Sequence, residues 1–297
     1  MKKLIVVLMI LGIIPFAFAT TLEVGSTGSS YTTINQAILA ASDGDVIRIH
    51  SGTYTENLRF SKSITLEGVT VNEVVVKPRI STSPTIMVEN CNRLNIRNLT
   101  LYGESIALSL AMTNAVINNN KIITTNDGIR AGTLNHEISI LNNSINGNYS
   151  SVRNKNSTGI MLVGIGKAII ENNTVTSFGT GLYLGGKDPV KISENQILSN
   201  NIGLYIAGNS NAIVYKNRIH KNVYCGLMIV SKPIVSVESN LFSSNLQYDL
   251  ILSNRNCGDF LIDFTGKLRG NDNIFSEKIK MCPEDFVLED DFIKDEE

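Results

Sequence analysis

Apolar and polar positions repeat along most of this chain with a period of about 22 residues. Each repeat reads Ile-x-x-Asn-x-Ile or a close variant, followed by a glycine and two apolar residues two positions apart. The pattern is clearest at 170–184, 192–206 and 214–229. A period of this length is typical of a solenoid, in which one turn cannot bury its apolar face alone. The sequence therefore predicts a stack of similar turns.

Each repeat contains three short stretches in which apolar residues alternate with period two. In one turn the inward residues are Ala168 and Ile170, then Val175, then Leu182 and Leu184. Alternation of this kind turns one face of a strand inward. Three short strands per turn, joined by tight turns, predict an all-β, single-stranded parallel β-helix.

One position of the repeat is almost always asparagine. From Leu99, the steps between successive repeats are 21, 23, 30, 22, 22 and 23 residues, and the long step carries an insertion at 146–156. Asparagine tolerates left-handed dihedrals at a corner, and its amide can bond along the axis to the next turn. We therefore predict a structural asparagine ladder, favoured over a ligand role, at Asn120, Asn143, Asn173, Asn195, Asn217 and Asn240.

The two ends of the coil differ from the repeats, which run over about 85–253. Residues 31–42 carry apolar residues at spacings of three and four, which predicts a helix that caps the open end. Residues 254–283 form a closing segment that completes a β-helix domain over 20–278. The tail at 284–297 is strongly acidic but also holds Phe286 and Phe292, so we expect partial docking on the C-terminal end.

The N-terminus has the layout of a secretory signal peptide over 1–19. Lys2 and Lys3 precede an apolar run at 4–14, and Ala17-Phe18-Ala19 resembles a cleavage site. The apolar run is too short to span a bilayer. We expect a secreted or periplasmic protein rather than an integral membrane protein.

The repeats resemble those of the right-handed parallel β-helix superfamily, which has the pectin-lyase-like fold and PbH1-type repeats. The stretch at 31–68 resembles the opening segment of pectin esterases and of NosD-type copper-site maturation proteins. The stretch at 257–286 resembles the closing segment of bacterial β-helix repeat proteins. The resemblance implies a right-handed coil of about ten turns. It implies little about activity, because this fold hosts lyases, hydrolases, esterases, epimerases and proteins without catalysis.

Four cysteines are present, and an exported chain can oxidise them. Cys257 and Cys282 flank the last apolar segment and are predicted to form a disulfide. Cys91 and Cys225 lie about six repeats apart, too far to bridge, and are expected to be buried free thiols.

Charge and composition exclude several function classes. The net charge is −1, and removal of Lys2 and Lys3 leaves 24 cations against 27 anions, or −3. A nucleic-acid partner would need a basic excess. The three histidines, His50, His136 and His220, fall at different phases of the repeat, so no metal site and no cofactor is predicted.

One face of the coil carries a continuous series of outward residues. Between the inward residues of the strand that begins with glycine, the series is Ser109, Arg130, Met161, Tyr183, Tyr205, Met228 and Ile251. Stacked turns place such neighbours about 4.8 Å apart. This outward stripe is either a ligand groove or a surface covered by a loop, the tail or another protein.

If the stripe is a groove, the insertion should overhang it. The candidate ligand-binding residues are then Tyr183, Tyr205, Arg130, Tyr149, Arg153 and Lys155. Tyrosine rings stack on sugars, and the cations at one end would suit an acidic polysaccharide.

The sequence thus predicts an exported β-helix protein with a carbohydrate-associated binding or surface-structural role, for which the expected partner is a polysaccharide or cell-surface glycan. One alternative is a polysaccharide lyase or glycoside hydrolase that acts on an acidic polysaccharide. The motifs of pectin esterases and galacturonidase-type hydrolases are absent from the sequence, and no catalytic residue is identified. A second alternative is a NosD-type periplasmic metal-handling accessory protein, which would need converging His, Met or Cys side chains.

Overall fold

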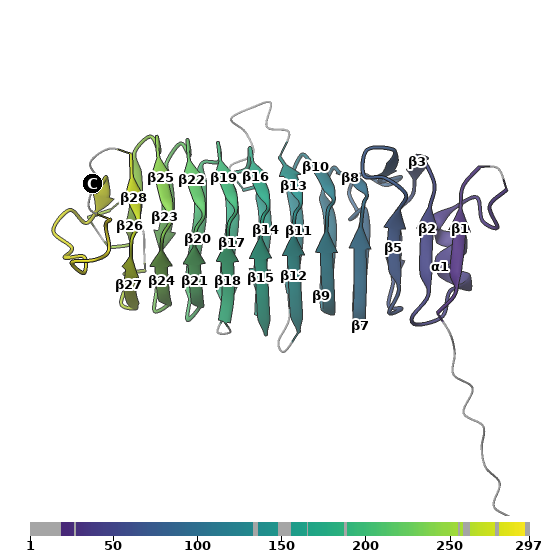
Figure 1. Ribbon diagram of the computed structural model, residues 1–297, viewed down its shortest axis with the longest axis horizontal. Coiled ribbons are helices and arrows are strands. Elements are labelled where there is room, and N and C mark those ends of the chain that lie inside the picture. The colour runs from purple at the N-terminus through teal and green to yellow at the C-terminus, as the bar shows by residue number, and fades with distance from the viewer. Residues whose placement is uncertain are drawn as a thin grey trace, which may run out of the picture.

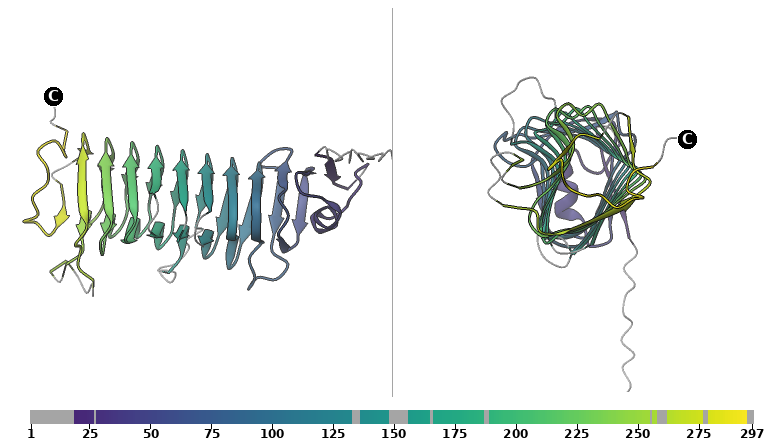
Figure 2. Two further views of the ribbon diagram at one scale, coloured as in Figure 1. Left: turned by 90° about the horizontal axis from the view of Figure 1, so that it is seen from below. Right: turned by 90° about the vertical axis from the view of Figure 1, so that its left-hand side faces the viewer.

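The computed structural model describes residues 19–26, 28–132, 136–147, 156–164, 166–186, 189–254, 256–257, 262–276 and 279–294. These residues form one elongated coil, in which each turn pairs in parallel with the next (Figure 1). Seen along its axis, the coil is a closed tube (Figure 2). The expected all-β, right-handed parallel β-helix with three strands per turn is confirmed.

Three faces run along the axis. The first is a ten-stranded sheet of one strand per turn: β3 (Gly52–Thr55), β6 (Val74–Lys77), β8 (Thr100–Gly103), β10 (Lys121–Thr124), β13 (Ser144–Asn146), β16 (Thr174–Thr176), β19 (Gln196–Leu198), β22 (Arg218–His220), β25 (Leu241–Ser243) and β28 (Ile274–Phe275).

The glycine face is named for the glycine near the start of five of its strands, β11, β14, β17, β20 and β23. It consists of β4 (Leu58–Phe60), the first parts of β7 (Ile86–Arg97) and β9 (Ile106–Asn118), β11 (Asp127–Gly132), β14 (Thr158–Val163), β17 (Thr180–Gly186), β20 (Ile202–Gly208), β23 (Cys225–Ile229), β26 (Tyr248–Leu252) and β29 (Met281–Cys282).

The third face follows the glycine face in each turn. It consists of β1 (Thr21–Val24), β2 (Val46–Ile49), β5 (Thr65–Gly68), the second parts of β7 and β9, β12 (Glu137–Leu141), β15 (Lys167–Glu171), β18 (Pro189–Ser193), β21 (Asn211–Tyr215), β24 (Ile234–Glu238) and β27 (Lys267–Asn271).

Inward residues stack on like residues of the next turn, and the core is built from these columns. On the third face one column is aliphatic through six turns and fully buried: Ile117, Ile140, Ile170, Ile192, Val214 and Val237. Burying each such side chain contributes about 1.5–3 kcal/mol. The alternation that predicted these strands is therefore also what fills the tube.

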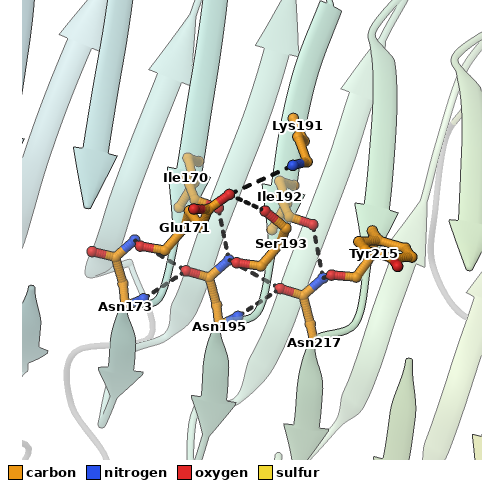
Figure 3. A network of polar contacts seen from close by, with 9 residues as sticks. All are labelled: Ile170, Glu171, Asn173, Lys191, Ile192, Ser193, Asn195, Tyr215 and Asn217. Atoms are coloured by element: carbon orange, nitrogen blue, oxygen red, sulfur yellow. Dashed lines mark hydrogen bonds and ion pairs between the residues drawn. The ribbon is translucent and has the colours of Figure 1, made fainter. Parts of the chain in front are cut away.

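The asparagine ladder lies at the corner between the third face and the ten-stranded sheet (Figure 3). Each side-chain oxygen accepts the backbone N–H of the asparagine one turn earlier, at 2.8–3.0 Å, from Asn120 through Asn240 to Asn273. Asn195, for example, accepts from Asn173 and donates to the carbonyls of Ile170 and Ser193. Each amide thus satisfies backbone groups of two turns that the corner would otherwise leave unpaired.

The left-handed residue at this corner is not the ladder asparagine itself, as the sequence argument assumed, but the residue before it. Asn142, Asn172 and Glu194 have φ of 56°, 56° and 58°. The same arrangement recurs at the next corner, where Ser199, Lys221 and Ser244 have positive φ. There a second ladder, Asn200, Asn222 and Asn245, was not predicted. A left-handed residue turns the chain sharply and directs the following side chain into the corner.

The glycine of the repeat is required by close approach of two turns. A Cβ atom at Gly181 would lie 2.6 Å from the carbonyl oxygen of Gly203, and one at Gly203 would lie 2.5 Å from that of Gly226. No side chain fits at such distances, so the column of glycines lets successive turns pack at this corner.

Both ends of the coil are covered. Helix α1 (Ile34–Ala40) lies within the expected cap, begins at the N-cap Thr33 and buries Ile34, Ala37 and Ile38 at the N-terminal end (Figures 1 and 2). Lys62 donates to three carbonyls at its C-terminal end, including Ala41 at 2.6 Å.

At the C-terminal end, part of the acidic tail folds back. Phe292 is buried and its carbonyl accepts from Asn273, the last member of the ladder. Val287, in contrast, is exposed.

The predicted disulfide joins Cys257 and Cys282, with their Cα atoms 5.6 Å apart. Cys91 and Cys225 are buried free thiols, as expected. Within the described ranges, no helix has the length and hydrophobicity needed to cross a bilayer.

Replacement of a ladder asparagine should be strongly destabilising. In Asn195→Ala the N–H of Asn173 and the carbonyl of Ile170 lose their partner inside the corner. Each unpaired buried group costs about 1–3 kcal/mol, so we expect a loss of about 2–6 kcal/mol in the free energy of unfolding. Guanidinium unfolding followed by circular dichroism measures it. Asn211→Ala, at an exposed position of β21, is the control. Equal stability of the two variants would contradict the structural role of the ladder.

Loss of the disulfide should loosen the closing segment. Cys257→Ser/Cys282→Ser removes a crosslink across 25 residues, for which we expect a loss of about 2–4 kcal/mol. Thermal melting with and without reductant tests this. Reductant should lower the melting temperature of the wild type and leave that of the double variant unchanged. A reductant effect of equal size in both proteins would show that the crosslink is not its target.

Candidate functional site

The outward stripe of the glycine face forms a single column. Arg130 pairs with Ser109 on one side and Met161 on the other. Tyr183 and Tyr205 follow in register, then Met228, Ile251 and finally Cys282. Residues from eight turns are thereby brought into one line.

The C-terminal half of this stripe is covered. Met228 and Ile251 are fully buried, and they pack in one cluster with Cys225 and the disulfide cysteines Cys257 and Cys282. Cys282 itself occupies the next position of the stripe. The closing segment therefore supplies the last strand of the glycine face and also covers the C-terminal half of the stripe. Of the two interpretations left open by the sequence, the covered surface applies to this half.

Tyr183 and Tyr205 stack on each other. Their ring centroids lie 5.2 Å apart and the planes differ by 11°. Rings wider than this separation cannot lie flat side by side on the sheet, so they tilt and overlap face to face. One face of each ring is therefore occupied by the other tyrosine. Burial, and then the neighbouring Tyr183, raise the pKa of Tyr205 above its ordinary value.

The N-terminal half of the stripe is open and bears a shallow groove of about 690 Å³. Its lining spans three turns and is mostly apolar: Ser109, Leu110, Ala111, Arg130, Ala131, Gly132, Met161 and Val163. Volumes of this size and linings of this kind are typical of small-ligand sites. Tyr183 lies one turn beyond Met161 and marks the end of the groove.

A second outward column of the glycine face, two residues further along each strand, was not predicted from the sequence. Its members next to the groove are Ala111, Gly132 and Val163, and it continues with Gly185 and Ala207. The signal for this column in the sequence was the series of mostly small residues at one outward position of the repeat. They leave room beside the larger side chains of the stripe, and this makes the surface concave.

Arg130 is the charged residue of the groove, and it is held in place. Its guanidinium pairs with Asp127, whose side chain is only 2% exposed, while the Arg130 side chain is 48% exposed. The other oxygen of Asp127 accepts the backbone N–H of Thr158 at 2.9 Å. The buried carboxylate therefore ties β11 to β14 and accepts from one terminal nitrogen of the guanidinium, whose remaining N–H groups stay available as donors.

Tyr149, Arg153 and Lys155, the other predicted ligand residues, lie outside the described residues. The histidines remain apart: His50 pairs with Glu23, and His220 is buried on the ten-stranded sheet, where burial lowers its pKa. Over the part of the chain that the structure describes, no group of three or more His, Cys, Asp or Glu side chains converges as a metal site would.

Comparison with known proteins supports the fold. A family model described as a right-handed β-helix region matches residues 148–280. A pectate lyase, Pel9A, is similar in structure with a TM-score of 0.61 and 14% identity, over 94% of this chain and 79% of that one. The alginate lyase from Paenibacillus sp. str. FPU-7 has a TM-score of 0.57 and 14% identity, over 88% and 97%.

The pectin methylesterase from carrot has a TM-score of 0.50 and 12% identity, over 91% of this chain and 87% of that one. No curated protein matches the sequence. Identities this low establish shared architecture only. The chain has a right-handed parallel β-helix fold.

The raised pKa of Tyr205 should appear in the pH dependence of stability. Because the neutral phenol is favoured in the folded protein, its contribution is fully present below about pH 10 and is lost as the pH rises through the higher folded pKa. Tyr205→Phe should therefore lose less stability above about pH 10 than the wild type.

Thermal melting from neutral to alkaline pH measures this difference. The control is Tyr102→Phe, at an exposed position of β8 on the opposite sheet. Parallel pH profiles for the wild type and Tyr205→Phe would contradict the assignment.

Proposed function

We propose that this protein is an exported carbohydrate-binding β-helix, and that a glycan segment lies in the groove between Ser109 and Met161. The observation that carries the proposal is the Arg130 guanidinium, held by an ion pair with the buried carboxylate of Asp127, in a mostly apolar groove of about 690 Å³. Of the described candidates, Arg130 lines this groove, while Tyr183 and Tyr205 both pack against the covered cluster.

The lining suits a sugar. Sugar rings have apolar C–H faces and a rim of hydroxyl groups. The small side chains of Ala111 and Gly132 let a ring approach the sheet, and the aliphatic surface of Met161 and Val163 covers its C–H face. The Arg130 guanidinium and the Ser109 hydroxyl can bond the rim. The polar groups would fix orientation while apolar contact supplies most of the affinity.

Binding fits these residues better than catalysis on the same face. Hydrolysis of a glycosidic bond generally needs two carboxyl groups flanking it. The described residues that line the groove include no carboxylate, and Asp127, which pairs with Arg130, has both of its oxygens engaged, one by Arg130 and one by Thr158. Arg130 remains protonated in a protein, so it donates hydrogen bonds rather than accepting a proton.

Export is part of the proposal. The segment at 1–19 reads as a signal peptide, and the Cys257–Cys282 disulfide persists in oxidising compartments outside the cytosol. A secreted or periplasmic location would place the groove within reach of envelope or environmental polysaccharides.

Filling the groove should abolish binding while the fold remains. At Gly132 a Cβ atom would meet only the carbonyl oxygen of Val163, at 3.5 Å, which is ordinary contact. Gly132→Leu therefore places a large side chain in the groove with little strain. We expect affinity for a glycan identified in a polysaccharide panel to fall at least about tenfold, equal to about 1.4 kcal/mol.

The matched control is Gln196→Leu, an exposed position on the ten-stranded sheet, which should bind as the wild type does. The panel is also assayed for release of reducing and unsaturated ends. Such release, lost in Gly132→Leu, would favour the lyase or hydrolase alternative. Unchanged glycan binding by Gly132→Leu would place the site elsewhere.

A further inference from the structure

We infer that the groove selects neutral glycans and discriminates against polyanionic ones. This inference rests on the proposed function and names the ligand class of the same site. It departs from the expectation that cations beside the stripe suit an acidic polysaccharide. Its basis is the charge balance of the described residues around the groove.

The cation of the groove is already neutralised. Arg130 forms its ion pair with Asp127, whose buried side chain is only 2% exposed. A ligand carboxylate cannot displace Asp127, because Asp127 also accepts the Thr158 N–H and is enclosed between β11 and β14. To an approaching anion, the pair is a dipole rather than a free positive charge.

Charges around the groove are balanced in the same way. Toward the N-terminus, Arg59 pairs with Glu89 at 2.8 Å on the same face. At the corner beyond Gly132 and Val163, Glu137 stands in register with Lys167. At the other edge, the exposed Glu104 adds a negative charge before β9. In the described strands of the glycine face from β9 to β20, Asp127 and Arg130 are the charged residues.

This balance decides between ligand classes. A polyanion gains affinity from uncompensated cations, and it pays a desolvation cost for each carboxylate that enters an apolar groove without a partner. The walls of Ala111, Gly132, Met161 and Val163 provide no such partner. A neutral sugar carries no ionic desolvation cost, and its hydroxyls can still accept hydrogen bonds from the N–H groups of Arg130.

The test uses the full mature chain and two sets of oligosaccharides of equal length. The neutral set derives from xylan, glucan and mannan, and the acidic set from alginate and polygalacturonate. Titration calorimetry is run at low and high sodium chloride. We expect binding of a neutral oligosaccharide, with an affinity that changes less than about twofold with salt, because no net ionic contact forms.

Two variants add net positive charge to the groove. Asp127→Asn keeps an acceptor for the Thr158 N–H but leaves Arg130 uncompensated. Ser109→Lys adds a free cation one turn away without altering Asp127, so the test does not depend on the stability of the first variant. Each should gain at least about tenfold in affinity for an acidic oligosaccharide at low salt, and this gain should disappear at high salt.

The outcomes separate the two proposals. Neutral binding in the wild type, with salt-sensitive acidic binding appearing in both variants, supports the inference. Salt-sensitive binding of alginate or polygalacturonate by the wild type, blocked by Gly132→Leu, overturns the inference and leaves glycan binding in the groove intact. Binding of neither set overturns both.

Discussion

The structure depends on one constraint: each turn must repeat the corner of the turn beside it, because a single asparagine amide serves the backbone of two turns. The oxygen of Asn195 holds the N–H of Asn173, and its nitrogen holds the carbonyl of Ile170. A turn with a different corner would leave these buried groups unpaired. Because each turn of a solenoid contacts only its neighbours, no other contact offsets the lost free energy of folding. The left-handed residue before each ladder asparagine and the crowded glycine column keep the same geometry.

A fixed interior leaves chemical variation to the outward side chains. Since successive turns pair in register, outward residues form columns, and a change of residue type along a column becomes a change along the surface. On the glycine face, small residues beside Arg130 and Met161 make a groove, and aromatic residues at Tyr183 and Tyr205 end it. Proteins that share this architecture at 12–14% identity can therefore differ in chemistry without any change of fold.

The end of the stack of turns explains why half of the stripe is covered. The last turn has no neighbour to cover its apolar side chains, so the chain returns through β29 and is pinned by the Cys257–Cys282 disulfide. That return buries Met228 and Ile251. The segment that ends the coil therefore also limits the open groove. The groove lies toward the middle of the coil because the C-terminal part of the stripe is buried.

Most of the architecture could be predicted from the sequence, because period-two alternation and a repeat near 22 residues report directly which side chains point inward. The ladder from Asn120 to Asn240, the column from Ser109 to Ile251 and the pairing of Cys257 with Cys282 all follow from position along the chain. Asn200, Asn222 and Asn245 carry the same signal and were overlooked. The sequence could not show that Asn273 continues the first ladder, because it lies 33 residues after Asn240, well outside the period of about 22 residues.

Only the tertiary structure decided what the outward residues present to a ligand. The tilt of Tyr183 and Tyr205 depends on how two rings share a turn spacing too small for them to lie flat. Asp127, three residues before Arg130, is held in place by the backbone N–H of Thr158 in β14, which begins 31 residues after it. The closing of the stripe depends on a non-periodic segment that returns to the coil. Periodicity determines on which side of the sheet a side chain lies, but the contacts that cover it, or that fix its charged neighbour, come from segments distant in the sequence.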